Sequence, residues 1–232
     1  MTGLQEWYLN FADEFYKSFI REDRYKLLIS GVGVTIRVSL LAVMIGILIG
    51  MVIAMCNLSK HKLPKILGGI YTDIIRGTPS VTQLMLIYFV VFASIHWEKW
   101  IIAAIAFGIN SGAYVSEIIR AGILSVDHGQ TEAGRSLGLS AFQTMSRIVI
   151  PQAVKNIFPA LCNEFIVLIK ETAIVGYVGL MDIQKAGDFI KSATYKPFMP
   201  LLGTAIIYYV LIKLLTLALR QVEKGLRKSD VR

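Results

Sequence analysis

Two glutamates in one mostly apolar run are the residues best suited to chemistry in this sequence. Glu164 and Glu171 lie seven residues apart, almost two turns of an α-helix, so both carboxylates are predicted to share one helix face. Inside a helical bundle, such a pair would suit an ammonium, guanidinium or imidazolium group. Lys170 would point elsewhere, as a counter-ion or toward a membrane interface. The alternative is that each glutamate only caps or pairs at a helix end.

A second polar stretch, "RGTPSVTQ" at residues 76–83, could supply the complement. Gly77 and Pro79 should interrupt or start a helix at a membrane boundary, and free backbone N–H groups at such a break can hold a carboxylate. A simple structural break is the alternative. The predicted substrate-binding residues are Glu164, Glu171, Thr78, Gln83, Asn163 and Ser80.

Further polar residues lie in the apolar run at about 100–119: Asn110, Ser111, Tyr114, Ser116 and Glu117. They could line a pathway, or they could only hydrogen-bond between helices.

The motifs of several enzyme classes are missing from the sequence. It contains no G-x-x-x-x-G-K-[ST] loop for a nucleotide phosphate and no H-E-x-x-H, and its three histidines are scattered. Cys56 and Cys162 match neither a metal-ligand spacing nor a disulfide framework. We therefore predict no catalytic residue, no metal site and no cofactor bound by this chain.

Composition indicates an all-α integral membrane protein. The 232 residues are 55% hydrophobic, and the mean hydropathy is +0.60. The net charge of +8 fits basic residues gathered in cytoplasmic loops better than nucleic-acid binding, because no basic helix occurs away from the apolar runs.

Five apolar segments are long enough to be predicted transmembrane helices, each needing about 20 residues. They are 38–58, 77–95, 100–116 extended by Ile118 and Ile119, 156–181, and 197–212 continued by 214–219. We predict a single domain, with an N-terminal segment 1–26, a five-helix core 27–220 containing a loop 124–155, and a tail 221–232.

The basic residues set the predicted orientation. Lysines are concentrated in the connection after the first predicted span, and arginines in the long connection after the third. The C-terminal tail contains both, so these three parts should be cytoplasmic. The N-terminus is then outside, the C-terminus is cytoplasmic, and residues 182–196 form the last outer loop.

The N-terminal segment has apolar residues at helical spacing: Leu4, Trp7, Tyr8, Phe11, Phe15 and Phe19. Acidic and basic residues fill the other face. This pattern fits a helix lying in the membrane interface, and a soluble cap packed on the bundle equally well.

Residues 132–151 predict two short helices joined by a tight turn. Glu132 lies in the first turn of one helix, Gly138 stops it, and Ser140 with Gln143 forms a capping box that starts the next. That second helix should present Phe142, Met145 and Val149 on one exposed stripe and end at Pro151. An amphipathic loop packing back on the bilayer is the alternative.

The same stretch resembles the E-A-A-x3-G-x9-I-x-L-P motif of ATP-binding-cassette (ABC) importer permeases. Gly134 replaces the usual alanine, which we expect to loosen the first helix, and Ile150 replaces a common leucine. Residues 31–50, 76–89, 112–140 and 163–183 are similar to the polar amino acid branch of that family. Together the similarity covers nearly residues 30–215.

The resemblance implies a MetI-like permease fold in which the loop forms coupling helices that dock on a separate cytoplasmic ATPase. The implied ATPase-coupling residues are Glu132, Ala133, Arg135, Gly138, Phe142, Met145 and Pro151. It also implies a second permease copy, two ATPase subunits that hydrolyse ATP with magnesium, an outer solute-binding protein and a place in the bacterial inner membrane.

The implied function is import of polar amino acids, and the predicted carboxylate pair favours histidine, arginine or lysine. Glutamine or another polar amino acid is the alternative. A non-transporting membrane scaffold that recruits a cytoplasmic partner, and an ATP-independent carrier or channel, are the other classes.

Overall fold

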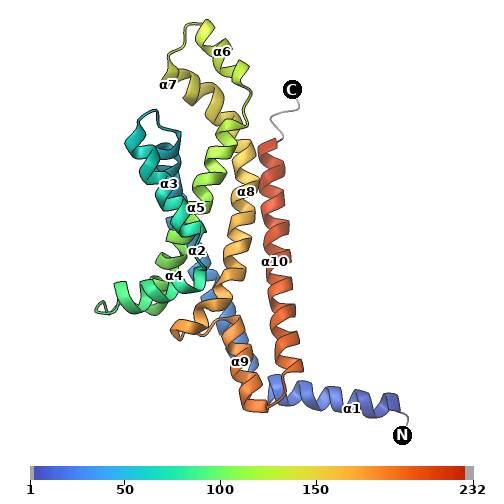
Figure 1. Cartoon of the computed structure of the whole chain (residues 1–232). Coiled ribbons are helices and arrows are strands. Elements are labelled where there is room, and N and C mark those ends of the chain that lie inside the picture. Colours follow the sequence, from blue (N-terminus) through green and yellow to red (C-terminus); the bar gives the residue numbers. More distant parts are fainter. Residues whose placement is uncertain (1–2, 228–232) are drawn as a thin grey trace.

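The computed structural model describes residues 3–227, and every regular element in that range is helical (Figure 1). The α-helices are α1 (Gly3–Phe15), α2 (Tyr25–Leu58), α3 (Lys62–Arg76), α4 (Ser80–Leu86), α5 (Lys99–Leu124), α6 (His128–Ser136), α7 (Ala141–Thr144), α8 (Ile150–Glu171), α9 (Ile183–Thr194) and α10 (Phe198–Arg227). Short π-helical turns span Tyr16–Ile20, Ile87–Val91 and Met145–Val149, and 3₁₀ segments span Arg21–Asp23 and Thr172–Val178.

Within the described range, three helices are long and apolar enough to cross a membrane: α2, α5 and the Phe198–Gly225 part of α10. A fourth span results if α3 and Ser80–Val91 count as one element bent by 103°. Residues 77–95 therefore do not form one continuous helix: α4 begins at Ser80, after the predicted break at Gly77 and Pro79, and its helical continuation ends at Val91.

The predicted span 156–181 also differs from the structure. It corresponds to α8, which ends at Glu171 and continues as a 3₁₀ segment. Helix α8, which carries Asn163 and Glu164, is not among the candidate spans of the described residues. By length and composition, the described residues thus contain three or four candidate spans, and the predicted count of five is not confirmed.

The core lies where α2 and α5 cross, with α4, α8 and the 3₁₀ segment Thr172–Val178 packed around them. Both helices carry a G-x-x-x-G pair at the crossing, Gly46 with Gly50 and Gly108 with Gly112. Small residues let helix backbones approach closely in a membrane. A Cβ at Gly50 would lie 2.5 Å from Cγ1 of Val115, so the crossing has no room for one.

Gly50→Ala is expected to destabilise the protein, because α2 and α5 must separate to admit the methyl group. Overpacking of this kind costs about 1–3 kcal/mol, or about 5 °C in the melting temperature. Gly33→Ala on the same helix is the matched control, since a Cβ there meets nothing within 4 Å. Thermal unfolding of the two purified variants in the same detergent checks this, and equal melting temperatures would contradict it.

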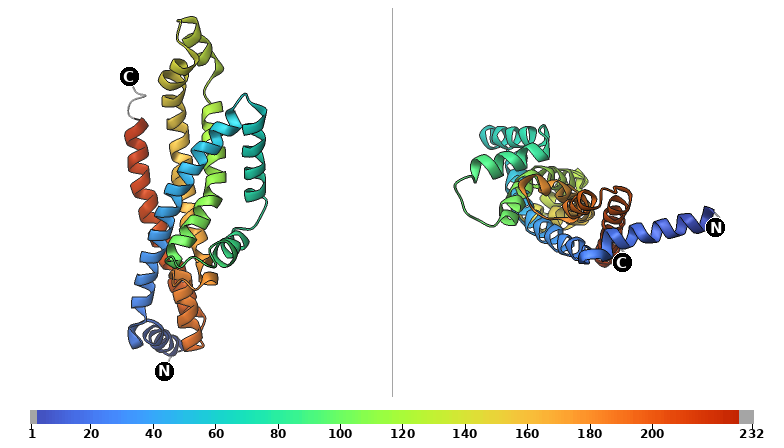
Figure 2. Two further views of the ribbon diagram at one scale, coloured as in Figure 1. Left: turned by 90° about the vertical axis from the view of Figure 1, so that its left-hand side faces the viewer. Right: turned by 90° about the horizontal axis from the view of Figure 1, so that it is seen from below.

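Helix α1 leaves the bundle at a sharp elbow and projects sideways from one end (Figures 1 and 2). Glu22 and Asp23 both adopt left-handed backbone angles, with φ of 60° and 54°, and Arg24 donates a 2.9 Å hydrogen bond to the carbonyl of Lys17. The ion pair of Lys196 with Glu14, at 2.7 Å, ties α1 to the segment after α9. The start of α1 projects away from the bundle (Figure 1), whereas Phe11 and Phe19 pack against it, so the segment is not a cap over the bundle as a whole.

The predicted outer loop 182–196 contains helix α9, and its place on the outer side of the membrane stays a prediction. Asp182 caps α9: its buried carboxylate accepts hydrogen bonds from the backbone N–H groups of Gln184 and Lys185. It also accepts one from the Tyr208 hydroxyl of α10 at 3.1 Å. The cap thereby fixes α9 against α10, a role that the sequence pattern did not reveal.

Candidate functional site

The bend between α3 and α4 is held by the side chain of Gln83. Its amide nitrogen donates to the carbonyls of Ile75 and Thr78 and to the Thr78 hydroxyl, at 2.7, 3.2 and 2.6 Å. Its amide oxygen accepts a 2.9 Å hydrogen bond from Asn110 of α5. Gln83 is therefore a buried brace between the bend and the core.

Thr78 belongs to the same brace, because its hydroxyl also donates to the carbonyl of Ile74 at 2.8 Å. Ser80 begins α4 directly after Pro79. The predicted break is thus confirmed as a feature of the fold. Direct contact of Thr78, Ser80 or Gln83 with a substrate stays a prediction.

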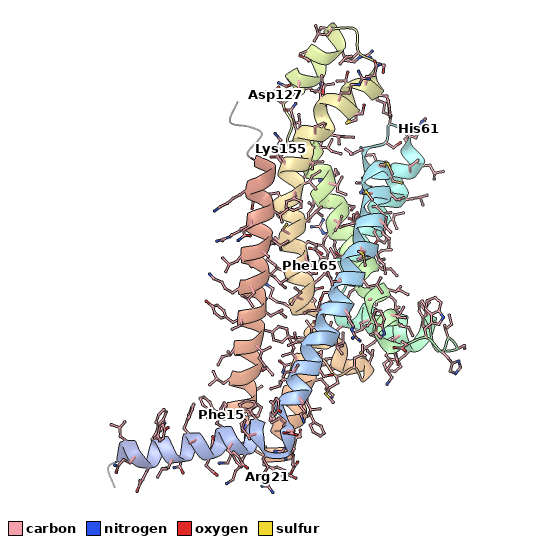
Figure 3. The ribbon with its side chains drawn as sticks, turned by 180° about the vertical axis from the view of Figure 1, so that it is seen from behind. Phe15, Arg21, His61, Asp127, Lys155 and Phe165 are labelled. Atoms are coloured by element: carbon pink, nitrogen blue, oxygen red, sulfur yellow. The ribbon has the colours of Figure 1, made fainter. Side chains whose placement is uncertain are left out.

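Helices α3, α5 and α8 border an open cavity of about 530 Å³. This volume lies in the range of ligand sites, roughly 300–1,000 Å³. The polar side chains that line it are Arg76, Tyr114, Glu117, Ser125, Asn156 and Glu164. Figure 3 shows the middle of α8, marked by Phe165, standing beside the neighbouring helices of the bundle.

Glu164 is the most deeply buried charged group of this cavity, with 9% of its surface exposed. Its Oε1 accepts a 2.8 Å hydrogen bond from the Ser111 hydroxyl of α5, and within residues 3–227 no other hydrogen bond to this carboxylate is formed. A buried carboxylate is costly unless a cation or several donors compensate it. The geometry therefore leaves Glu164 able to bind a cationic group.

The cavity also holds positive charge, which the predicted set of binding residues does not include. The Arg76 guanidinium lies over the Tyr114 ring, 5.6 Å from its centroid. Glu117 pairs with Arg120 one helical turn away at 2.7 Å. The sequence signal for this positive charge was the arginine of "RGTP". Only the glycine and the proline of that motif were used, to predict a break.

Glu171 and Asn163 lie elsewhere on α8. Glu171 is its last residue and is partly buried, whereas Asn163 is exposed. Neither lines the cavity that contains Glu164. Glu164 and Glu171 lie on the same helix, but only Glu164 lines the cavity.

The loop 124–155 forms two helices at the far end of the molecule, beyond the ends of α5 and α8 (Figures 1 and 3, with Asp127 and Lys155 marking its base). Gly138, with φ of +83°, ends α6, and the N–H of Leu139 returns to the carbonyl of Gly134 at 3.2 Å. Ser140 and Gln143 form the reciprocal capping box that starts α7. Both predicted features of the turn, the glycine that ends the first helix and the capping box that starts the second, are confirmed.

The end of the second helix is predicted incorrectly. Pro151 does not end it but lies in the first turn of α8, which continues from the π-helical turn Met145–Val149. Since proline has no N–H to donate, the start of a helix tolerates it well.

The exposed stripe also changes composition. Val149 is buried, with 4% exposed, whereas Phe142 and Met145 are exposed as predicted. Leu137, which directly follows α6, is 81% exposed, and Phe142 is 80% exposed, so Leu137 is added to the exposed set. The apolar tip thus consists of Leu137, Phe142 and Met145.

Gly134 does not loosen α6, contrary to our expectation. It is buried where α6 meets the second helix, and a Cβ would lie 2.8 Å from Cδ1 of Ile148 and 2.9 Å from Cγ2 of Thr144. The missing side chain lets the two short helices pack closely.

The sequence profile of one family, described as "Binding-protein-dependent transport system inner membrane component", matches residues 46–228. The chain belongs to this family. The putative glutamine transport system permease GlnP of Rickettsia bellii is 42% identical over 86% of this chain and 92% of its own. The arginine transport system permease ArtQ of Bacillus subtilis is 38% identical over 88% of this chain and 94% of its own.

Solved structures agree with the family assignment. An amino acid ABC transporter crystallised with histidines matches with a TM-score of 0.82 and 42% identity, over 89% of this chain and 98% of its own. The inward-facing MetNI methionine ABC transporter, at 17% identity, matches with a TM-score of 0.75 over 86% and 96%. The latter shows the fold alone, and it confirms the MetI-like permease fold. The resemblance to ABC importer permeases is likewise confirmed.

Proposed function

We propose that this chain is the permease subunit of an ABC importer for polar amino acids, and that the preferred substrates are basic. The observation that carries the proposal is the cavity between α3, α5 and α8, where buried Glu164 and the guanidinium of Arg76 line the same volume. Ionisable groups of opposite sign that line one cavity, one of them a buried carboxylate, suit a zwitterion.

Arg76 is the group suited to the α-carboxylate, because a guanidinium binds a carboxylate through two parallel hydrogen bonds. Glu164 is suited to the side-chain cation of arginine, lysine or histidine. Glutamine is the second candidate, supported by the name of the relative GlnP. The name of the relative ArtQ supports arginine.

In the proposed topology, α2, the bent α3–α4 element, α5, α8 and α10 form five spans. The N-terminus lies outside and the C-terminus in the cytoplasm, which places the loop 124–155 on the cytoplasmic side with the basic residues. Two permease copies in the bacterial inner membrane would enclose the pathway, with a solute-binding protein on the outer side.

The energy would come from two separate ATPase subunits that hydrolyse ATP with magnesium, since the sequence has no phosphate-binding loop of its own. The exposed apolar tip of Leu137, Phe142 and Met145 would dock on them. The buried carboxylate of Glu164 argues against a pure scaffold, because a scaffold gains nothing from such a costly group.

Reconstitution of the chain with its ATPase and binding protein in liposomes tests the proposal. We expect arginine, lysine or histidine to stimulate ATP hydrolysis and uptake about tenfold more than leucine, or about 1.4 kcal/mol. Selective stimulation by glutamine would favour the second candidate. No stimulation by any amino acid would contradict both.

A further inference from the structure

We propose that the elbow between α1 and the bundle holds one phospholipid, with an acyl chain in an apolar groove and a zwitterionic headgroup on the charged elbow. The groove has a volume of about 420 Å³. Its walls include Phe11, Phe15 and Phe19 from the N-terminal arm, Leu28 from α2, and Leu202 and Ile206 from α10. Figure 3 shows the corner at the labels Phe15 and Arg21.

With α10 spanning the membrane, the groove would face hydrocarbon rather than water. Its second wall belongs to α10, a candidate span whose most apolar stretch has only 6% of its residues buried inside the protein. Leu202 and Ile206 are accordingly 37% and 52% exposed. A groove with these walls takes a flexible apolar chain and offers nothing to a polar ligand.

The arm that roofs the groove is amphipathic. Leu4, Trp7 and Tyr8 are exposed on α1, and α1 stands across the direction of α10 (Figure 1). Such a helix is suited to the membrane interface. The groove then opens where acyl chains meet headgroups.

The elbow carries charged side chains of both signs, which would lie at the level of the lipid headgroups. Residues 13–26 contain four carboxylates and four basic side chains, so the segment is neutral overall. Exposed pairs within this segment join Lys17 with Asp13 and Lys26 with Asp23, at 2.7 and 2.6 Å, whereas Glu14 pairs with Lys196. Exposed pairs of this kind are weak, so they can rearrange around a phosphate and an ammonium.

The same charges favour a lipid over a second protein copy as the occupant. A protein partner seated in the groove would cover the elbow and take these ion pairs out of water, which is costly. A headgroup leaves them hydrated. The consecutive left-handed residues Glu22 and Asp23 keep the elbow angle, and hence the groove, in one geometry.

Native mass spectrometry of the full chain, purified with its ATPase partner in detergent, tests this inference. After lipid removal, titration with phosphatidylethanolamine should load one lipid per permease copy, and phosphatidylglycerol should bind more weakly. Leu202→Trp should fill the groove and lower the lipid affinity about tenfold, the equivalent of about two buried methylenes. Leu217→Trp is the matched control, because Leu217 is also exposed on α10, at 46%, and lies outside the groove.

Equal lipid binding by the two tryptophan variants would overturn the site. Equal or tighter binding of phosphatidylglycerol would overturn the zwitterionic headgroup. The variant Leu202→Cys, with Cys56→Ser and Cys162→Ser, provides a second test in membranes. A disulfide between copies at that position would show that protein, not lipid, fills the groove.

Discussion

Glu164→Gln is expected to lower arginine and lysine uptake about 30-fold, which corresponds to about 2 kcal/mol. The reason is that glutamine keeps the hydrogen bond from Ser111 but removes the charge that would neutralise a buried cation. Glutamine uptake should fall much less, because its side chain brings no charge. Uptake into proteoliposomes with each labelled amino acid, together with basal ATP hydrolysis, checks this.

Glu171→Gln is the matched variant, with the same substitution on the same helix. The seven-residue spacing predicts equal losses for the two glutamates. The cavity geometry predicts a smaller loss at Glu171, which does not line the volume around Glu164. Equal losses would favour the carboxylate pair, and a loss for every amino acid with Glu164→Gln would mean that this residue binds the common ammonium group.

The turn between α6 and α7 could be predicted from the sequence because its code is local. Gly138 supplies the left-handed residue, and Ser140 and Gln143 satisfy each other's backbone N–H groups within one turn. Similarly, hydropathy located α2, α5 and α10, since each is a continuous apolar run.

The sequence predicts the break at Gly77 and Pro79, but the angle of the bend and the cavity depend on contacts distant in sequence. Hydropathy counts apolar residues and does not show that Gln83 braces a turned chain against Asn110, 27 residues away. Arg76, Glu117 and Glu164 come from three helices, and only packing brings them together. Helix α9 is a similar case: Asp182 is a residue type common at N-caps, but its hydrogen bond from Tyr208 of α10 depends on packing.

The burial of Val149 has a related cause. A stripe drawn on an ideal helix assumes a regular rotation for every residue, and the π-helical turn Met145–Val149 changes that rotation. Val149 consequently faces the interior, while the tip of the loop recruits Leu137 from the other helix. The exposure of Phe142 and Met145 was predicted correctly, but that of Val149, on the far side of the π-helical turn, was not.

Phe142→Asp is expected to uncouple the transporter, lowering uptake about 100-fold and abolishing the stimulation of ATP hydrolysis by substrate. Phe142 is 80% exposed in this chain, so its ring is accessible to the proposed ATPase contact, and an aromatic anchor in an interface is worth about 2–4 kcal/mol. A buried, unpaired carboxylate at the same place adds a desolvation cost. Co-purification of the ATPase and substrate-stimulated hydrolysis measure the loss.

Two further substitutions separate coupling from folding. Phe142→Leu keeps an apolar side chain and should restore most of the uptake, with membrane insertion equal in all variants. Val149→Asp should instead reduce the amount of folded protein, because Val149 is buried inside the permease. If Phe142→Asp kept normal coupling, the exposed tip of Leu137, Phe142 and Met145 would not be the docking surface, and the loop would pack against the bilayer.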